Sequence, residues 1–518
     1  MTSDEAVRRL KAFKRGKPVS NGATLRIKRL PDSQVLILCF VRMGGESSPW
    51  GVAFGRPGKK PTILTTPEPR TRDDVAEMMV KLAPELLTHL HHPRFSPFGP
   101  SPDTKVPPFQ VWVPNPSHLE MLHHLAYAYT FTRFGAPSRA QTLNYLGHAC
   151  GWLFRESQRP GQMVTFAATD ALTEAFTFPA EKTRQGHLGF LLAWLETKGS
   201  RQARETAAAE AERQSVSTSL DPALERDELQ SWVEEFGPAR TAGDDAVVAR
   251  ATRRIHAVLK EELERRFSLT ERALAVLAAD SRRENFGVEV LAKASLDEHR
   301  LQYRRIEQQI DDNEDGPAFR PSPETDRYPS AAGSRFYVHE ASEELRDQLL
   351  VHDDRELLAE LIGTGQAIGG TITDVRDEGV GKKTVPVWVV ESDAGLPLRI
   401  REDSTLCVVG LRSREVRVRS IERRKEGGYR FELVVTKLIT KPHADGANVL
   451  PATSASLRGK RVQLVKPSMD QIARRRSGLI WKRDVPGAWL THRVPKVPEA
   501  DLPDGVAEDL SSIDKGQR

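Results

Sequence analysis

The chain has 518 residues, of which 28% are charged and 39% hydrophobic, the balance of a globular protein with about three or four domains. Its most apolar run, Val35–Val41, is too short to span a bilayer, and no apolar segment of a signal peptide follows the basic N-terminus. The three cysteines (Cys39, Cys150, Cys407) are too scattered for a disulfide framework or a metal knuckle. These features exclude a membrane-spanning or disulfide-stabilised protein and predict a cytoplasmic protein without membrane contact.

The net charge of +5 is modest, but the positive charge is clustered. Residues 1–30 carry nine Lys or Arg against two acids, and residues 451–496 carry eleven against two, whereas residues 499–518 carry six acids against two bases. Basic ends can serve solubility alone. Clustering is a stronger signal than total charge, so this pattern favours a polyanionic partner such as nucleic acid.

The N-terminal part predicts a basic flexible tail (1–24) followed by an α/β domain (25–137). The expected elements of this domain are the strands Gln34–Arg42, Trp50–Phe54 and Thr62–Thr65, the helix Thr71–His89, the strand Phe109–Val113 and the helix Ser117–Thr132. Ser117 and Glu120 have the spacing of a capping box for the last helix.

This order, β-β-β-α-β-α, resembles that of the exonuclease-type RNase H-like proteins. The resemblance implies two-metal phosphodiester hydrolysis by acids on the first strand and later elements. The first strand here, Val35–Arg42, carries no acid, and Glu46 lies beyond it in a turn. We therefore expect a degenerate RNase H-like scaffold, with an active metal-dependent nuclease as the alternative.

Residues 138–309 are predicted to be a helical region, either a stalk or an ordinary bundle. Capping boxes at Ser138–Gln141 and Ser268–Glu271 would begin two of its helices, and Trp152 and Trp194 are expected to be core residues. Residues 310–334 are acidic and rich in proline, as in a linker.

Residues 335–442 are predicted to contain a short strand (Arg335–His339), a helix (Ser342–Ile362) and a small antiparallel β-barrel. The expected barrel strands are Ile368–Arg376, Thr384–Glu391, Leu396–Ile400, Thr405–Val409, Glu415–Ile421 and Tyr429–Thr436. Residues 443–518 are expected to be a loop-rich segment with one strand, Lys460–Lys466, and a short helix, Met469–Arg476. The whole is a multidomain α+β protein.

The candidate site is the basic surface of this barrel. The stretch from Arg412 to Lys425 carries seven Lys or Arg against two Glu, and a turn between two strands adds two lysines. That turn lacks the spacing and the following helix of a phosphate-binding loop. The predicted nucleic-acid-binding residues are Lys382, Lys383, Arg412, Arg414, Arg417, Arg419, Arg423, Arg424 and Lys425.

Two sets of histidines invite a metal site but lack a partner acid or cysteine at ligand spacing. The sets are His89, His91 and His92, and His118, His123 and His124. No catalytic residue, metal or cofactor is predicted.

The helices before residue 309, the helix Ser342–Ile362 and the barrel Ile368–Thr436 resemble the region that precedes the motor core of bacterial superfamily 1B nucleic-acid helicases. Trp489–His492, Leu502–Asp504 and Val506–Leu510 resemble the approach to the first ATPase motif, but no ATPase motif is present. The resemblance implies a non-catalytic accessory subunit that binds single-stranded DNA or RNA and a separately encoded superfamily 1 ATPase. By analogy, it would serve DNA repair or defence against phage. A protein-interaction scaffold is the remaining alternative.

Overall fold

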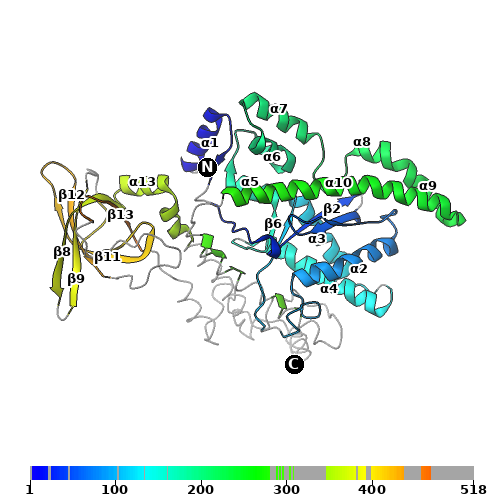
Figure 1. Cartoon of the computed structure of the whole chain (residues 1–518), viewed down its shortest axis with the longest axis horizontal. Helices are drawn as coiled ribbons and strands as arrows, with labels where there is room; N and C mark the ends of the chain where they lie inside the picture. Colours follow the sequence, from blue (N-terminus) through cyan, green and yellow to red (C-terminus); the bar gives the residue numbers. More distant parts are fainter. Residues whose placement is uncertain are drawn as a thin grey trace, which may run out of the picture.

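The computed structural model describes residues 3–21, 25–44, 47–101, 104–133, 135–159, 161–280, 346–380, 383–392, 398–436 and 457–467, with isolated helical positions between 288 and 307. It shows a mixed α+β molecule in which a sheet-and-helix unit lies beside a β-barrel (Figure 1). Four predicted segments lie outside the described residues: the linker 310–334, the short strand Arg335–His339, the helix Met469–Arg476 and the segment Trp489–Leu510.

The N-terminal unit is built on a five-stranded sheet in the order β4-β3-β2-β5-β6. β2 (Val35–Arg42), β3 (Pro49–Gly55) and β4 (Thr62–Thr65) form an antiparallel meander, whereas β5 (Gln110–Val113) and β6 (Thr165–Ala167) run parallel to β2. The first four strands confirm the sequence prediction. β6 was not predicted, because three residues are too few for a recognisable alternation of polar and apolar side chains.

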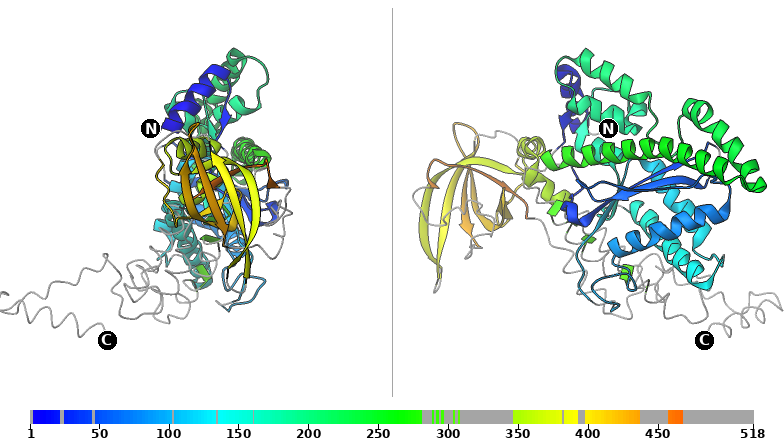
Figure 2. Two further views of the ribbon diagram at one scale, coloured as in Figure 1. Left: turned by 90° about the vertical axis from the view of Figure 1, so that its left-hand side faces the viewer. Right: turned by 45° about the vertical axis from the view of Figure 1, so that its right-hand side comes forward.

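β2 is continuously apolar because helices cover both faces of the sheet. Its alternate side chains enter two separate cores. One core contains α10 (Asp245–Asp280), α5 (Ala168–Ala175) and α6 (Leu188–Glu196), and the other contains α2 (Arg72–His89), α3 (Pro116–Tyr129) and α4 (Pro137–Ser157). Figure 2 shows α10 on one side of the sheet and α2 and α4 on the other. The unit therefore continues past residue 137, where we expected it to end, and includes much of the predicted stalk.

All three predicted capping boxes are wrong. α3 begins one residue before Ser117, since Pro116 occupies its first turn and the Asn115 side chain accepts the Ser117 N–H at 3.1 Å. α4 likewise begins at a proline, Pro137, without a side-chain cap. Ser268 lies inside the 36-residue α10, whose buried residues continue on both sides of it and favour an unbroken helix.

The predicted basic tail contains regular structure. Residues Ser3–Arg15 form α1, and β1 (Val19–Ser20) pairs with β7 (Phe176–Thr177). Arg8 of α1 forms an ion pair of 2.8 Å with Asp354, and Lys11 forms another with Glu356. α1 therefore connects the sheet unit to α13 (Arg355–Gly363), the helix that leads into the barrel.

The remaining helices of the sheet unit are short. α7 (Arg201–Glu212) follows α6, and α8 (Pro222–Leu224) leads through a π-helical turn (Glu225–Leu229) into α9 (Gln230–Ala242). Trp152 and Trp194 are buried, as predicted.

The barrel has six strands whose pairings close into a ring, β10-β11-β12-β9-β8-β13. β8 (Ile368–Val380), β9 (Lys383–Ser392), β10 (Thr405–Val408), β11 (Leu411–Arg423) and β12 (Tyr429–Val435) confirm five predicted strands. The predicted strand Leu396–Ile400 is wrong, because residues 398–400 are not in a strand. The sixth strand is β13 (Arg461–Val465), which pairs with both β8 and β10. The barrel thus extends past the predicted boundary at residue 442, and closure leaves no free sheet edge.

Candidate nucleic-acid interface

The structure separates the two predicted basic groups of the barrel. Tyr429 at the start of β12 lies opposite both Arg423 of β11 and Ser392 of β9. Lys383 is the first residue of β9 and therefore lies at the other end of that strand. β9 has 10 residues, so its ends are about 30 Å apart. Lys383 and Arg423 are therefore too far apart to belong to one site.

Not every predicted site residue has a described side chain. Lys382 lies outside the described residues, and only the backbone positions of Lys383, Arg412 and Arg414 are described. Arg417, Arg419, Arg423, Arg424 and Lys425 are described in full. They run along β11 from its middle to the turn before β12.

A change of register divides β11 into two parts. Before it, Val416 and Val418 are buried in the barrel core while Arg417 is exposed. The register then shifts between Val418 and Ser420, so that Ile421 packs against the core beyond the shift. A bulge of this kind changes the face on which the following side chains lie. Arg423 is therefore at the end of the barrel and not on the same outer surface as Arg417.

The arginines in the middle of the barrel are neutralised by carboxylates. Arg417 contacts Asp403 at 2.6 Å, and Arg419 contacts Glu378 of β8 at 2.6 Å. The hydrogen bond from Arg419 lowers the pKa of the Glu378 carboxyl. Arg376 joins the same network through Glu378 and through Glu432 of β12, at 2.7 and 2.6 Å. These side chains stabilise neighbouring strands and are poorly placed to bind phosphate.

The turn between β11 and β12 is different. Arg423 and Lys425 are exposed, and neither forms an ion pair within the described part of the chain. Arg424 lies 3.6 Å from both Glu391 and Glu426. We call Arg423, Arg424 and Lys425 the hairpin tip. Of the predicted basic residues with described side chains, Arg423 and Lys425 retain the most positive charge for a partner.

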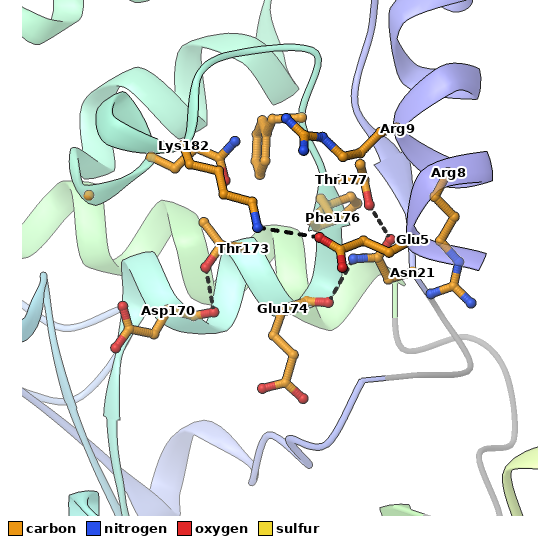
Figure 3. Close-up of a pocket in the computed structure, with 13 residues that line it drawn as sticks. Glu5, Arg8, Arg9, Asn21, Asp170, Thr173, Glu174, Phe176, Thr177 and Lys182 are labelled. Carbon is orange, nitrogen blue, oxygen red and sulfur yellow. Dashed lines mark hydrogen bonds and ion pairs between the residues drawn. The ribbon is translucent and has the colours of Figure 1, made fainter. Parts of the chain in front are cut away.

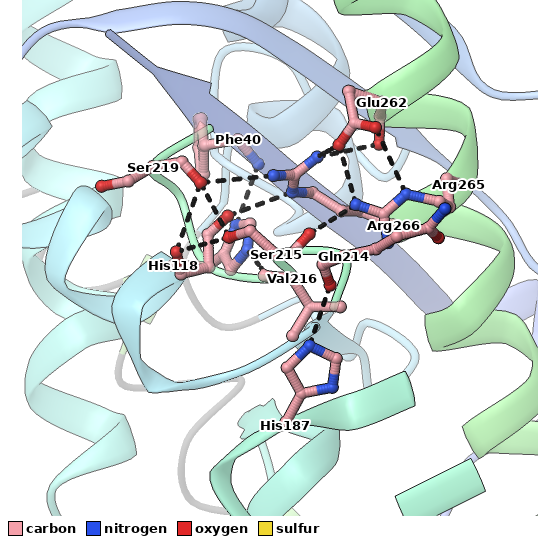
Figure 4. A network of polar contacts seen from close by, with 11 residues as sticks. Phe40, His118, His187, Gln214, Ser215, Val216, Ser219, Glu262, Arg265 and Arg266 are labelled. Atoms are coloured by element: carbon pink, nitrogen blue, oxygen red, sulfur yellow. Dashed lines mark hydrogen bonds and ion pairs between the residues drawn. The ribbon is translucent and has the colours of Figure 1, made fainter. Parts of the chain in front are cut away.

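A second polar network covers the end of β2 (Figure 4). The Nδ1 atom of His118 accepts the Phe40 N–H at 3.0 Å, and its Nε2 atom donates to the Val216 carbonyl at 3.1 Å. Burial and the nearby Arg266 lower the pKa of His118 to about 3, so the ring is neutral at physiological pH. His118 is thus a structural residue of the core.

The segment 215–219 is held against this end of the sheet. The Arg266 guanidinium donates to the Ser217 carbonyl at 3.0 Å and to the Glu262 carboxylate at 2.5 Å. The Arg42 N–H donates to the Thr218 carbonyl at 2.7 Å. These bonds occupy the polar groups at the carboxyl end of β2, the strand on which the nuclease alternative requires acids.

A cavity of about 610 Å³ lies between α1 and α5 (Figure 3). Its lining mixes acids and bases in equal measure, and Lys182 lies 3.3 Å from Glu5. Burial raises the pKa of Asp170, which also lines the cavity. Asn21 donates to the Glu174 carbonyl at 3.0 Å and accepts from Thr177 at 2.7 Å. These contacts attach the N-terminal segment to α5 and β7.

In the part of the chain that the structure describes, no three His, Cys, Asp or Glu side chains are grouped as metal ligands, and no helix is long and apolar enough to cross a membrane. No protein-family model, no curated protein and no solved structure matches the chain. The functional assignment therefore depends on this chain's own residues.

Proposed function

We propose that the protein binds single-stranded nucleic acid at the hairpin tip of the barrel. The observation that carries this proposal is the contrast along β11. Arg417 and Arg419 are bound by carboxylates, whereas Arg423 and Lys425 are exposed without such partners in the described residues. Lysine and arginine side chains of this kind bind phosphates and release counterions, which makes the affinity dependent on salt.

The test compares two double variants of the full chain with a labelled single-stranded oligonucleotide. Arg423→Ala/Lys425→Ala removes two phosphate contacts and should lower the dependence of log affinity on log salt by about 1.4. Arg417→Ala/Arg419→Ala is the matched control, since it removes the same charge from the same β-hairpin but should leave the slope nearly unchanged. Absence of binding by the unmodified protein at low salt would refute the proposal. Equal slopes for the tip variant and the unmodified protein would also refute it.

The barrel also supports a proposed role as an accessory to a separately encoded superfamily 1 ATPase. α13 leads directly into β8, as a supporting helix leads into an inserted barrel in the helicases that the chain resembles. The accessory role predicts that the protein binds such an ATPase and increases its unwinding rate. Size-exclusion chromatography and a strand-separation assay with the purified pair test this, and failure of both would reject the partnership without affecting nucleic-acid binding.

For the sheet unit we propose a degenerate RNase H-like fold. The support is its strand order, a meander of β2, β3 and β4 with β5 and β6 added parallel to β2. Two-metal hydrolysis requires acids close to the metals, and β2 carries none. Cleavage of an oligonucleotide in the presence of Mg²⁺ or Mn²⁺ by the purified protein would favour the nuclease alternative instead.

A further inference from the structure

The helical hairpin of α3 and α4 exposes aromatic rings on its outer surface. The opposite face of α3 is buried in the sheet core through Leu119, Leu122 and Leu125. On the outer face Tyr127 is 91% exposed, and Phe131, just beyond the end of α3, is 50% exposed. Large apolar side chains left in solvent do not stabilise the fold, and when they are clustered they mark binding surfaces.

These rings are arranged in a row. His124 and Tyr127 are three residues apart on α3, which places them on one side of the helix, and Phe131 follows in the turn just beyond it. Phe131 continues the row to His148 of α4, with ring centroids 6.2 Å apart. Beside the row, His123 stacks on Phe154 at 4.7 Å.

The chain segment that carries the row contains no acid. Residues 121–155 contain no Asp or Glu, and the only acid on α3 is Glu120, at the far end of the helix. Arg133 is exposed and forms no ion pair within the described residues. Arg139 is less available, because it donates to the Asp73 backbone carbonyl at 2.9 Å and lies 3.6 Å from the exposed carboxylate of the same residue. Glu156, the first acid after this stretch, is buried and lies 3.0 Å from Arg159.

We infer that this surface of α3 and α4, defined by His124, Tyr127, Phe131 and Arg133, is a second contact site for single-stranded nucleic acid. Bases stack on exposed rings without regard to sequence, while nearby cations attract the phosphates. The charged side chains within residues 121–155 are all arginines (Arg133, Arg139 and Arg155), which favours a polyanion over a protein partner. The identity of the ligand rests on the proposed function, but this site lies on the sheet unit and uses stacking, whereas the hairpin tip uses charge.

Close packing of α4 against the end of α3 limits which residues near the row can be substituted. A Cβ atom at Gly147 would overlap the backbone of Thr130, so α4 must approach the end of α3 closely. Substitutions within this contact would disturb the fold. Tyr127 is 91% exposed and can be changed with little effect on stability, whereas Phe131 is 50% exposed and its ring lies against His148, so the unfolding midpoint of each variant is measured beside its binding.

The experiment measures binding of labelled oligothymidine to the full chain. Tyr127→Ala/Phe131→Ala should weaken binding at least about thirtyfold and leave the salt slope unchanged, because two stacking contacts but no cation are lost. Tyr127→Phe, which retains the ring, should bind like the unmodified protein. Phe13→Ala is the matched control, since Phe13 is 42% exposed on α1, away from the row.

The outcomes separate the two proposals. If the unmodified protein does not bind, the proposed function fails. If the tip variant changes the salt slope but Tyr127→Ala/Phe131→Ala binds normally, only the second site is rejected. A double variant that binds oligothymidine normally but loses a copurifying protein would also overturn this inference and would identify the surface as a protein-docking site.

Discussion

Replacing His118 by Ala should destabilise the sheet unit strongly. The ring is fully buried and makes one hydrogen bond at each nitrogen, to the Phe40 N–H and to the Val216 carbonyl. Alanine would leave both backbone groups without partners. Each unsatisfied buried group costs about 1–3 kcal/mol, and the cavity left by the ring adds to this. We expect a loss of about 3–5 kcal/mol, a large part of the roughly 5–15 kcal/mol that stabilises a typical protein.

Urea unfolding followed by circular dichroism measures this loss, and amide hydrogen exchange localises it. The Phe40 N–H should lose protection in His118→Ala while amides of the barrel strands keep theirs. His124→Ala is the control, because His124 is exposed on the same helix and its loss should change the free energy of unfolding by less than about 0.5 kcal/mol. A His118→Ala protein within about 1 kcal/mol of the unmodified one would refute the role given to this network.

Three further predictions concern stability. The pKa of His118 in the folded protein is about 3, below its ordinary value of 6.5, so the neutral ring stabilises the fold above pH 6.5. This contribution to the free energy of unfolding falls as the pH drops from 6.5 towards 3. Urea midpoints should therefore decline over that range, and less steeply in His118→Ala. Gly147→Ala should cost about 1–3 kcal/mol in the same assay, since its methyl group would overlap the backbone of Thr130, and an unchanged midpoint would contradict this. Asp354 caps α13 and binds Arg8, so a double-mutant cycle of Arg8→Ala and Asp354→Ala should show a coupling free energy of about 0.5–1 kcal/mol, whereas strict additivity would show that the pair does not hold α1 to α13.

Local patterns in the sequence determined most strands and many helices. The run Val35–Val41 is apolar at every position, which identifies a strand buried on both faces, and the alternation along β12 identifies a barrel strand. These predictions are confirmed because such signals come from adjacent residues. Helix starts were less predictable, since a Ser-x-x-Glu or Ser-x-x-Gln spacing also occurs within helices and after a proline that has already begun one.

The tertiary structure alone decided how distant segments combine. β13 closes the barrel although it lies beyond the predicted domain boundary at residue 442. Similarly, β6 completes the five-stranded sheet and α10 covers one of its faces, although we expected that domain to end at residue 137. The same holds for the site. Asp403 forms an ion pair with Arg417, and Glu378 forms one with Arg419. The bulge in β11 places Arg423 at the end of the barrel, away from the outer surface that carries Arg417. A count of basic residues along the chain cannot show which cations have acidic neighbours, because those neighbours come from other strands.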